Sequence, residues 1–188
     1  MTAQLSRRSL LGVAAGGIAF AAVGVRPARG ATDDELAYAN FGLAAAYLGA
    51  DYYAQALKGA KPTGAGRTLR SGRSASLAQA SALSHLITGA GDTPAAAEDF
   101  EFTWPRSAFA STVGTRKTGF GVLRPTLAAY QSAAASVTMA SYRVLFASLA
   151  ASVAQQIGAL GGPSEAAAPF PPALDLEAAS AALESYLG

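Results

Sequence analysis

The 188-residue sequence contains no cysteine, and only 14% of its residues are charged. The absence of cysteine excludes disulfide bonds, thiolate metal sites and cysteine nucleophiles. The chain also lacks a Gly-x-Ser-x-Gly turn, a P-loop, and a Gly-x-Gly-x-x-Gly motif that opens a helix after a strand. These absences argue against the common serine hydrolases and against enzymes that bind nucleotides through glycine-rich loops.

The few charged residues are unevenly distributed. Four of the 14 basic residues (Arg7, Arg8, Arg26 and Arg29) lie in the first thirty residues, which hold none of the 12 acids. The other 158 residues therefore carry 10 bases and 12 acids, a formal charge of about −2. Without an excess of positive charge in this part of the chain, we expect no nucleic-acid partner.

The first thirty residues resemble a signal peptide of the twin-arginine export pathway. Arg7 and Arg8 stand before an apolar run of about sixteen residues, which is shorter than the ~20 residues of a membrane span. Ala28-Arg29-Gly30 has the small residues of a cleavage site, which predicts a cut after Gly30 and a periplasmic or other extracytoplasmic location. The alternative is an uncleaved membrane anchor. Once the signal is removed, we expect no stable membrane span.

The rest of the chain is predicted to be all-α. Thr32, followed by three acids, is typical of a helix start, and apolar residues recur at three- and four-residue spacing as far as Leu57. Further helices are predicted over about 74–88, over two segments of 126–160 with Pro125 at the start and a turn near 136–142, and over 174–187. Residues 126–160 are divided because one helix of that length would span about 50 Å, too long for a small domain.

Two connections carry distinctive side chains. A glycine-rich loop after the first helix holds five bases, Lys58, Lys61, Arg67, Arg70 and Arg73. We interpret it as a solvated loop, the alternative being an anion or lipid-headgroup site. A long connection over residues 92–121 holds the aromatic residues Phe100, Phe102, Trp104, Phe109 and Phe120. We expect an ordered strap packed over the helices, the alternative being a ligand-binding lid.

The stretch NFGLAAAYLGADYYAQAL, residues 40–57, resembles the first helix of ferritin-like domain proteins, in particular the exported, desiccation-related group. The order of elements agrees over residues 33–162. The resemblance implies a ferritin-like four-helix up-down bundle with a long aromatic connection between helices 2 and 3 and a short C-terminal helix. It divides the chain into a signal peptide (1–30), the bundle (31–165), and a Pro- and Ala-rich linker with the closing helix (166–188).

Metal-binding members of this family hold two ions with inward-facing Glu and Glu-x-x-His side chains. The resemblance places those ligand positions on Ala46, Gly49, Ala82, His85, Tyr130 or Gln131, Ala154 and Ile157. Two divalent ions need several anionic oxygens, and no acid occurs between Gly121 and Gly162. The sequence therefore predicts no metal, no cofactor and no catalytic residue, with His85 the only remaining ligand-type side chain.

His85 itself has three interpretations. We expect it to be partly buried and hydrogen-bonded to Tyr47, Tyr130 or Gln131. The alternatives are a residual metal ligand and a pH switch.

Three functions follow from these patterns. The first is an exported, metal-free protein with a structural, binding or accessory role, including an envelope stress role, acting through a protein partner or as a homo-oligomer. The second is a binder of a small apolar molecule or lipid in the emptied bundle centre, with Ala46, Tyr47, Gly49, Ala82, His85, Tyr130 and Gln131 as candidate lining residues. The third is a di-metal oxidase whose ligands lie elsewhere than this alignment places them.

Overall fold

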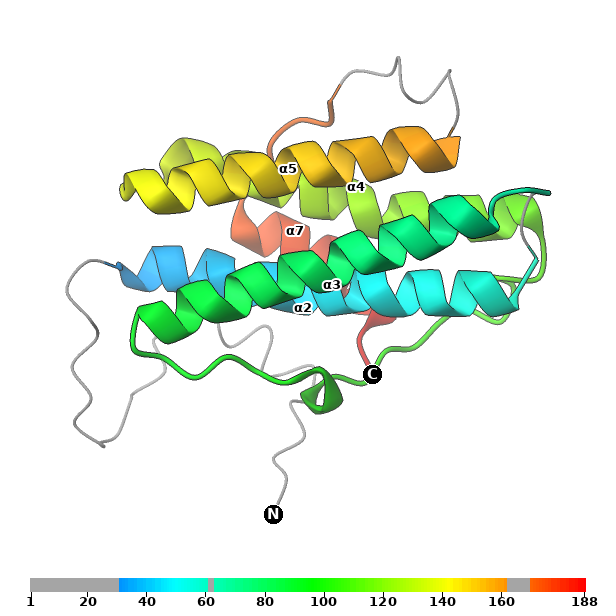
Figure 1. Ribbon diagram of the computed structural model, residues 1–188, viewed down its shortest axis with the longest axis horizontal. Coiled ribbons are helices and arrows are strands. Elements are labelled where there is room, and N and C mark those ends of the chain that lie inside the picture. Colours follow the sequence, from blue (N-terminus) through cyan, green and yellow to red (C-terminus); the bar gives the residue numbers. More distant parts are fainter. Residues whose placement is uncertain (1–30, 61–62, 162–169) are drawn as a thin grey trace.

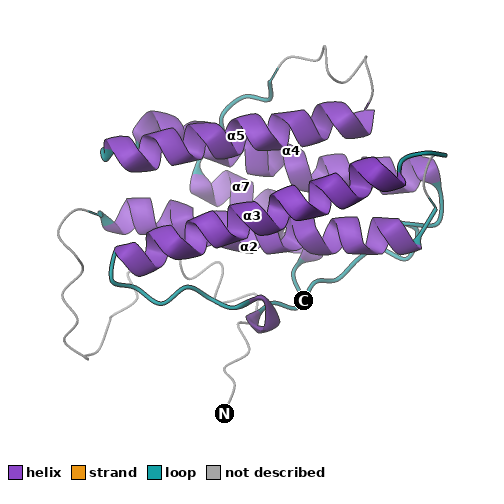
Figure 2. Ribbon diagram, in the orientation of Figure 1, coloured by secondary structure: helices purple, strands orange, loops and turns teal. Residues whose placement is uncertain are grey.

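The computed structural model describes residues 31–60, 63–161 and 170–188, and these residues form helices and loops without a strand. Four long helices make up the bundle: α2 (Asp33–Lys58), α3 (Gly66–Gly89), α4 (Thr112–Ser136) and α5 (Ala140–Gly161) (Figures 1 and 2). Shorter helices are η1 (Ala97–Asp99), α7 (Leu176–Leu183) and η2 (Glu184–Tyr186). The all-α prediction is confirmed. The predicted signal peptide, with Arg7 and Arg8, lies outside the described residues.

The long helices form two antiparallel hairpins, α2 with α3 and α4 with α5. Residues 90–111 lead the chain back along the length of the bundle, so α3 and α4 run in the same direction (Figure 1). The four helices thus run up, down, down and up. The connection can span the bundle because an extended residue covers about 3.3 Å and a helical residue about 1.5 Å.

α3 begins at Gly66, and not near residue 74 as predicted. Arg67, Arg70 and Arg73 consequently lie on a helix and not in a loop. The glycines of this region predict a loop, but Gly72 lies inside the helix at a position where a larger residue would not fit. A Cβ atom there would lie 2.3 Å from Cζ of Tyr53. Glycine at this position lets the Tyr53 ring pack directly against the backbone of α3.

α4 begins at Thr112, and Pro125 lies in its interior and not at its start. The predicted connection is therefore shorter, and Phe120 belongs to α4. Gly119 was expected in a loop, yet it is a helical position at which a Cβ atom would lie 2.4 Å from the Tyr52 hydroxyl. The turn predicted near 136–142 is confirmed, since α4 ends at Ser136 and α5 begins at Ala140.

Glu35 joins the start of α2 to the start of α5. Thr32 and Glu35 form a capping box, in which the backbone N–H of Thr32 donates to Glu35 Oε2 at 2.9 Å. The other carboxylate oxygen, Oε1, accepts from the backbone N–H groups of Thr138 (2.8 Å) and Met139 (2.9 Å) and from the Thr138 hydroxyl (2.9 Å). Burial alone would raise the pKa of Glu35, but these hydrogen bonds outweigh it and lower the pKa from 4.5 to about 2.

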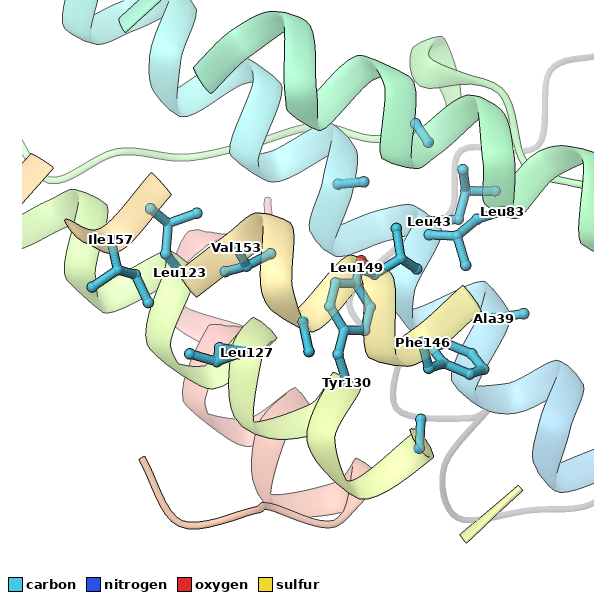
Figure 3. Close-up of a cluster of buried hydrophobic side chains, with 14 of the residues drawn as sticks. Ala39, Leu43, Leu83, Leu123, Leu127, Tyr130, Phe146, Leu149, Val153 and Ile157 are labelled. Carbon is cyan, nitrogen blue, oxygen red and sulfur yellow. The ribbon is translucent and has the colours of Figure 1, made fainter. Parts of the chain in front are cut away.

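The main core lies between the two hairpins. Leu43, Leu83, Tyr130, Phe146 and Leu149 point toward one another from all four long helices (Figure 3). All five are nearly inaccessible to solvent. Their burial is the main stabilising contribution to the bundle.

The C-terminal segment covers a second apolar cluster on the other side of α2 and α4. Ala179 and Leu183 of α7 pack there against Phe41, Leu48 and Val122. The predicted closing helix is present but shorter, with α7 covering Leu176–Leu183 and η2 following it. This segment also meets the connection, because Phe102 and Leu187 form an isolated antiparallel bridge.

The aromatic residues of the connection pack over α2, as predicted for an ordered strap. The Phe100 ring lies 5.7 Å from the Tyr47 ring, and the Trp104 ring lies 6.2 Å from that of Tyr52, measured between centroids. Trp104 Nε1 donates to Asp51 Oδ2 at 2.7 Å. This charge-assisted hydrogen bond fixes the strap on the bundle.

Among the described helices, α5 alone is long and apolar enough to cross a membrane by length and composition, with a mean hydropathy of 1.5. In the structure 39% of its most apolar window is buried. Phe146, Leu149 and Val153 on that face point into the core (Figure 3). α5 is thus a packed helix of the bundle.

Candidate binding site

The centre of the bundle, which we considered as an apolar pocket, is occupied by side chains. Tyr130 fills the space beside Gly42, where a Cβ atom would lie 2.9 Å from the tyrosine ring, and its hydroxyl donates to the Gly42 carbonyl at 3.1 Å. Burial raises the pKa of Tyr130, so the hydroxyl stays a donor. Gly49 faces Ser76, whose Oγ would be 3.1 Å from a Cβ atom at this glycine, and Ala46 belongs to the packed core.

The remaining candidate residues do not converge on one site. Tyr47 packs against Phe100 of the strap, and Ala82 is only partly buried. Gln131 is partly buried, and its Oε1 has no hydrogen-bond partner. Tyr130 and Ala46 share the main core cluster and Tyr47 packs against its edge, but Ala82 and Gln131 are not part of it.

His85 is exposed, which contradicts the expectation of a partly buried, hydrogen-bonded histidine. The reason is the phase of α3. Leu83 and Ile87 face the core, and His85 lies two residues from each, about 200° around the helix. The alignment of a Glu-x-x-His motif with Ala82 and His85 therefore does not place an inward-facing ligand on α3.

A di-metal centre does not fit the described residues. They contain no group of three or more His, Cys, Asp or Glu side chains that could hold a metal ion. Helices α3, α4 and α5 contain no acid in their sequence, so three of the four long helices offer no carboxylate. Hard divalent cations bind mainly through such oxygens.

Polar side chains of α3 and α5 meet in a contact zone that is not among the features predicted from the sequence. Gln79 Nε2 donates to Ser152 Oγ at 3.0 Å, and the Ser76 hydroxyl lies 3.5 Å from Gln156 Oε1. Gln156 is 7% exposed, and its Nε2 has no hydrogen-bond partner. A buried amide group without a partner is costly, which makes this position informative.

The unpartnered amide belongs to the lining of a pocket of about 350 Å³ between the two helices. The α3 side is formed by Arg67, Thr68, Ser71, Gly72 and Ala75, the α5 side by Ser152, Gln155, Gln156 and Ala159, and Tyr53 of α2 completes the lining. A volume of this order is at the lower end of the range for small-molecule sites. We define these ten residues as the α3–α5 pocket.

The electrostatic character of the α3–α5 pocket is positive. Its lining contains the guanidinium of Arg67 and no carboxylate. Arg70 and Arg73 follow on the exposed side of α3. Because α3 and α5 carry no acid at all, nothing on either wall neutralises this charge.

A signal for the pocket exists in the sequence. Ser76 lies seven residues from both Leu69 and Leu83, two residues of the buried face of α3, and Gln156 lies seven residues after the buried Leu149. Polar side chains thus interrupt two apolar stripes at heptad positions. Such interruptions indicate a polar contact inside the bundle, but they do not indicate which two helices meet there.

Comparison of the chain with family models, with curated proteins and with solved structures found no significant match. The fold and the site define the class of protein by its geometry: a four-helix bundle with a filled apolar centre and, between two of its helices, a pocket whose lining includes polar side chains.

Proposed function

We propose that this chain is an exported, metal-free bundle of the ferritin-like type that acts by binding and not by catalysis. Two features support the ferritin-like part of the proposal. One is the stretch of residues 40–57, and the other is the long connection between α3 and α4, since ferritin-like bundles have one crossover of this kind.

The observation that carries the metal-free part is the packing at the bundle centre. The Tyr130 ring occupies the space beside Gly42, and its hydroxyl is already used by the Gly42 carbonyl. A metal ion placed there would meet an apolar, hydrogen-bonded interior with no carboxylate from α3, α4 or α5. The same packing leaves no room for an apolar ligand beside Gly42, which favours the accessory or binding role over the emptied-centre alternative.

Metal analysis of the folded protein tests this proposal. The protein is produced in medium supplemented with iron and manganese, purified without chelators, and analysed by elemental mass spectrometry. We expect less than stoichiometric metal and no change in melting temperature when Fe²⁺ or Mn²⁺ is added, because a ligand that binds only the folded state would raise it. One or two ions bound per chain would contradict the proposal and restore the di-metal oxidase.

Export by the twin-arginine pathway is the second part of the proposal. It rests on Arg7 and Arg8 and the apolar run that follows them. Replacing both arginines with lysine is expected to stop export while leaving the net charge unchanged. Unchanged export of this variant would show that another route is used.

A specific observation also favours a second function, the binding of a small polar molecule. The α3–α5 pocket has a buried, unpartnered amide, a cation and several hydroxyl groups. Ligand sites typically have a small number of polar groups that converge in a pocket. This candidate differs from the apolar or lipid ligand expected from the sequence, because its site lies beside Gln156 and not at Ala46, Gly49 and Ala82.

A further inference from the structure

The lining of the α3–α5 pocket includes a residue, Gln156, whose buried amide nitrogen is a hydrogen-bond donor that the protein itself leaves unused. Gln156 Nε2 carries two N–H groups, and neither has a partner, although the side chain is 93% buried. Its Oε1 faces the Ser76 hydroxyl, and the amide is thereby oriented with its nitrogen end free. The Ser152 hydroxyl accepts from Gln79, which leaves its own proton available for donation.

The other polar groups of the pocket share this preference for an acceptor. The Arg67 guanidinium can only donate, and the hydroxyls of Thr68 and Ser71 on the next turn of α3 can donate as well. No carboxylate in the lining competes for these donors. A ligand that satisfies the pocket must therefore bring acceptor oxygens, and the charge of Arg67, which no carboxylate among the described lining residues balances, favours a negative one.

We propose that the α3–α5 pocket binds a small molecule through an oxyanion, a phosphate or carboxylate group, held between Arg67 on α3 and the amide of Gln156 on α5. The oxyanion accepts from the guanidinium on one wall and from Nε2 on the other. The ligand thereby links two helices that meet through few direct hydrogen bonds, those of the polar contact zone. This inference rests on the second function proposed above, the binding of a small polar molecule, and deepens it by naming the chemical class of the ligand and the two residues that hold it.

The volume of the pocket sets the size of the ligand. About 350 Å³ accommodates a phosphate ester or carboxylate of modest size and excludes a large cofactor. Tyr53, Ala75 and Ala159 supply the apolar part of the lining. An oxyanion attached to a short carbon chain fits this division between donors and apolar surface.

Nuclear magnetic resonance of the ¹⁵N-labelled protein tests the site directly, because the side-chain NH₂ group of Gln156 gives its own signals. Inorganic phosphate is the first probe and glycerol 3-phosphate the second, each titrated against sodium chloride at the same ionic strength. We expect saturable shifts of the Gln156 side-chain signals and of the backbone amides of residues 67–71. Chloride at the same ionic strength is expected to leave these signals unchanged.

Two variants and a matched control assign the binding to this pocket. Arg67→Gln removes the cation from an exposed position and is expected to weaken phosphate binding about tenfold or more. Gln156→Leu removes the amide and is expected to abolish the saturable response. Arg73→Gln removes the same charge from the exposed face of α3, outside the pocket lining, and is expected to leave the affinity almost unchanged.

The possible outcomes distinguish a specific oxyanion site from general charge attraction and from a lipid-headgroup site. Equal weakening by Arg67→Gln and Arg73→Gln would indicate attraction by the general charge of α3, and it would overturn the proposal. Absence of any response of the wild-type protein to both probes would also overturn the proposal. If Gln156→Leu does not fold, Arg67→Gln still tests the site. Vesicles of phosphatidylglycerol form a third arm: broadening of the Gln156 signals by vesicles, without a response to soluble phosphates, would assign the site to a lipid headgroup and contradict a small ligand. None of these results depends on the metal analysis.

Discussion

Replacement of Glu35 by glutamine tests the most specific contact between the ends of the helices. Glu35 is 1% exposed, and its two oxygens accept four hydrogen bonds from Thr32, Thr138 and Met139. A carboxamide has a single acceptor oxygen. If that oxygen keeps the three donors at the start of α5, the new NH₂ group faces the Thr32 N–H, donor against donor. The variant therefore loses the charge and one complete hydrogen bond.

The size of the effect follows from the pKa. A pKa lowered from 4.5 to about 2 corresponds to about 3 kcal/mol of folding free energy, because each tenfold change in acidity is worth about 1.4 kcal/mol. The neighbouring Thr32 and Thr138 are exposed, so water screens part of this interaction, and we take about 2 kcal/mol. For a domain of this size, that loss lowers the melting temperature by roughly 4–8 °C.

The pH dependence of the folding stability tests this contribution of Glu35. A carboxyl group whose pKa is lowered by folding contributes its full stability above its unfolded pKa, here 4.5, and loses it as the pH falls toward 2. Thermal unfolding followed by circular dichroism from pH 7 to pH 2.5 should therefore show a gap between wild type and Glu35→Gln that shrinks below pH 4.5. Glu98→Gln, a matched change at an exposed position, serves as the control and should show almost no gap. A gap that is absent at pH 7, or that persists unchanged at pH 2.5, would contradict this role of the Glu35 carboxylate.

Two further predictions concern the strap and the α2–α3 contact. Asp51→Ala removes the acceptor of Trp104 Nε1 and is expected to cost about 1–2 kcal/mol in urea unfolding. It should also shift the fluorescence emission to longer wavelength, and since the chain has one tryptophan, unchanged emission would contradict our account of the strap. Gly72→Ala introduces a Cβ atom against Tyr53 and is expected to destabilise the protein by about 2–3 kcal/mol. Gly89→Ala, at a helical glycine with open space around it, should be neutral or slightly stabilising, and equal losses for both variants would show that the packing argument is wrong.

The sequence predicts the helix ends that depend on local chemistry. Thr32 followed by Asp33, Asp34 and Glu35 marks the start of α2, and the capping box is present in the structure. The division between α4 and α5 was predicted from length alone and is also confirmed. Both features depend on residues close together in the chain, which explains why they can be inferred without knowledge of the tertiary structure.

The starts of α3 and α4 were misplaced because glycine has two structural uses. Around Gly72 and Gly119 the sequence was interpreted as loop, since glycine commonly interrupts helices. In the structure these glycines lie within helices, at points where a tyrosine from α2 packs against the backbone. A tertiary contact decides between the two uses, and that contact involves residues far away in the chain.

The candidate pocket could not be located for a related reason. The resemblance placed a site at Ala46, Gly49 and Ala82, and small residues at former ligand positions suggested an empty centre. The side chains that border this centre, such as Tyr130, are contributed by other helices. The α3–α5 pocket depends on the directions of the helices, which residues 90–111 set by returning along the bundle.

Glycine and tyrosine pairs explain why small residues on these helices do not produce a cavity. Gly42 receives Tyr130, Gly72 receives Tyr53, and Gly119 receives Tyr52, each from a neighbouring helix. Two of the tyrosine hydroxyls donate to backbone carbonyl groups across the bundle, that of Tyr130 to Gly42 and that of Tyr52 to Thr115 at 3.0 Å. Each pair therefore fills a volume with a ring, and two of the three pairs add a hydrogen bond, so the apolar centre is occupied by the chain itself. By contrast, the buried amide nitrogen of Gln156 has no partner where α3 and α5 face each other with serine and glutamine, and this is the reason to look for a ligand there.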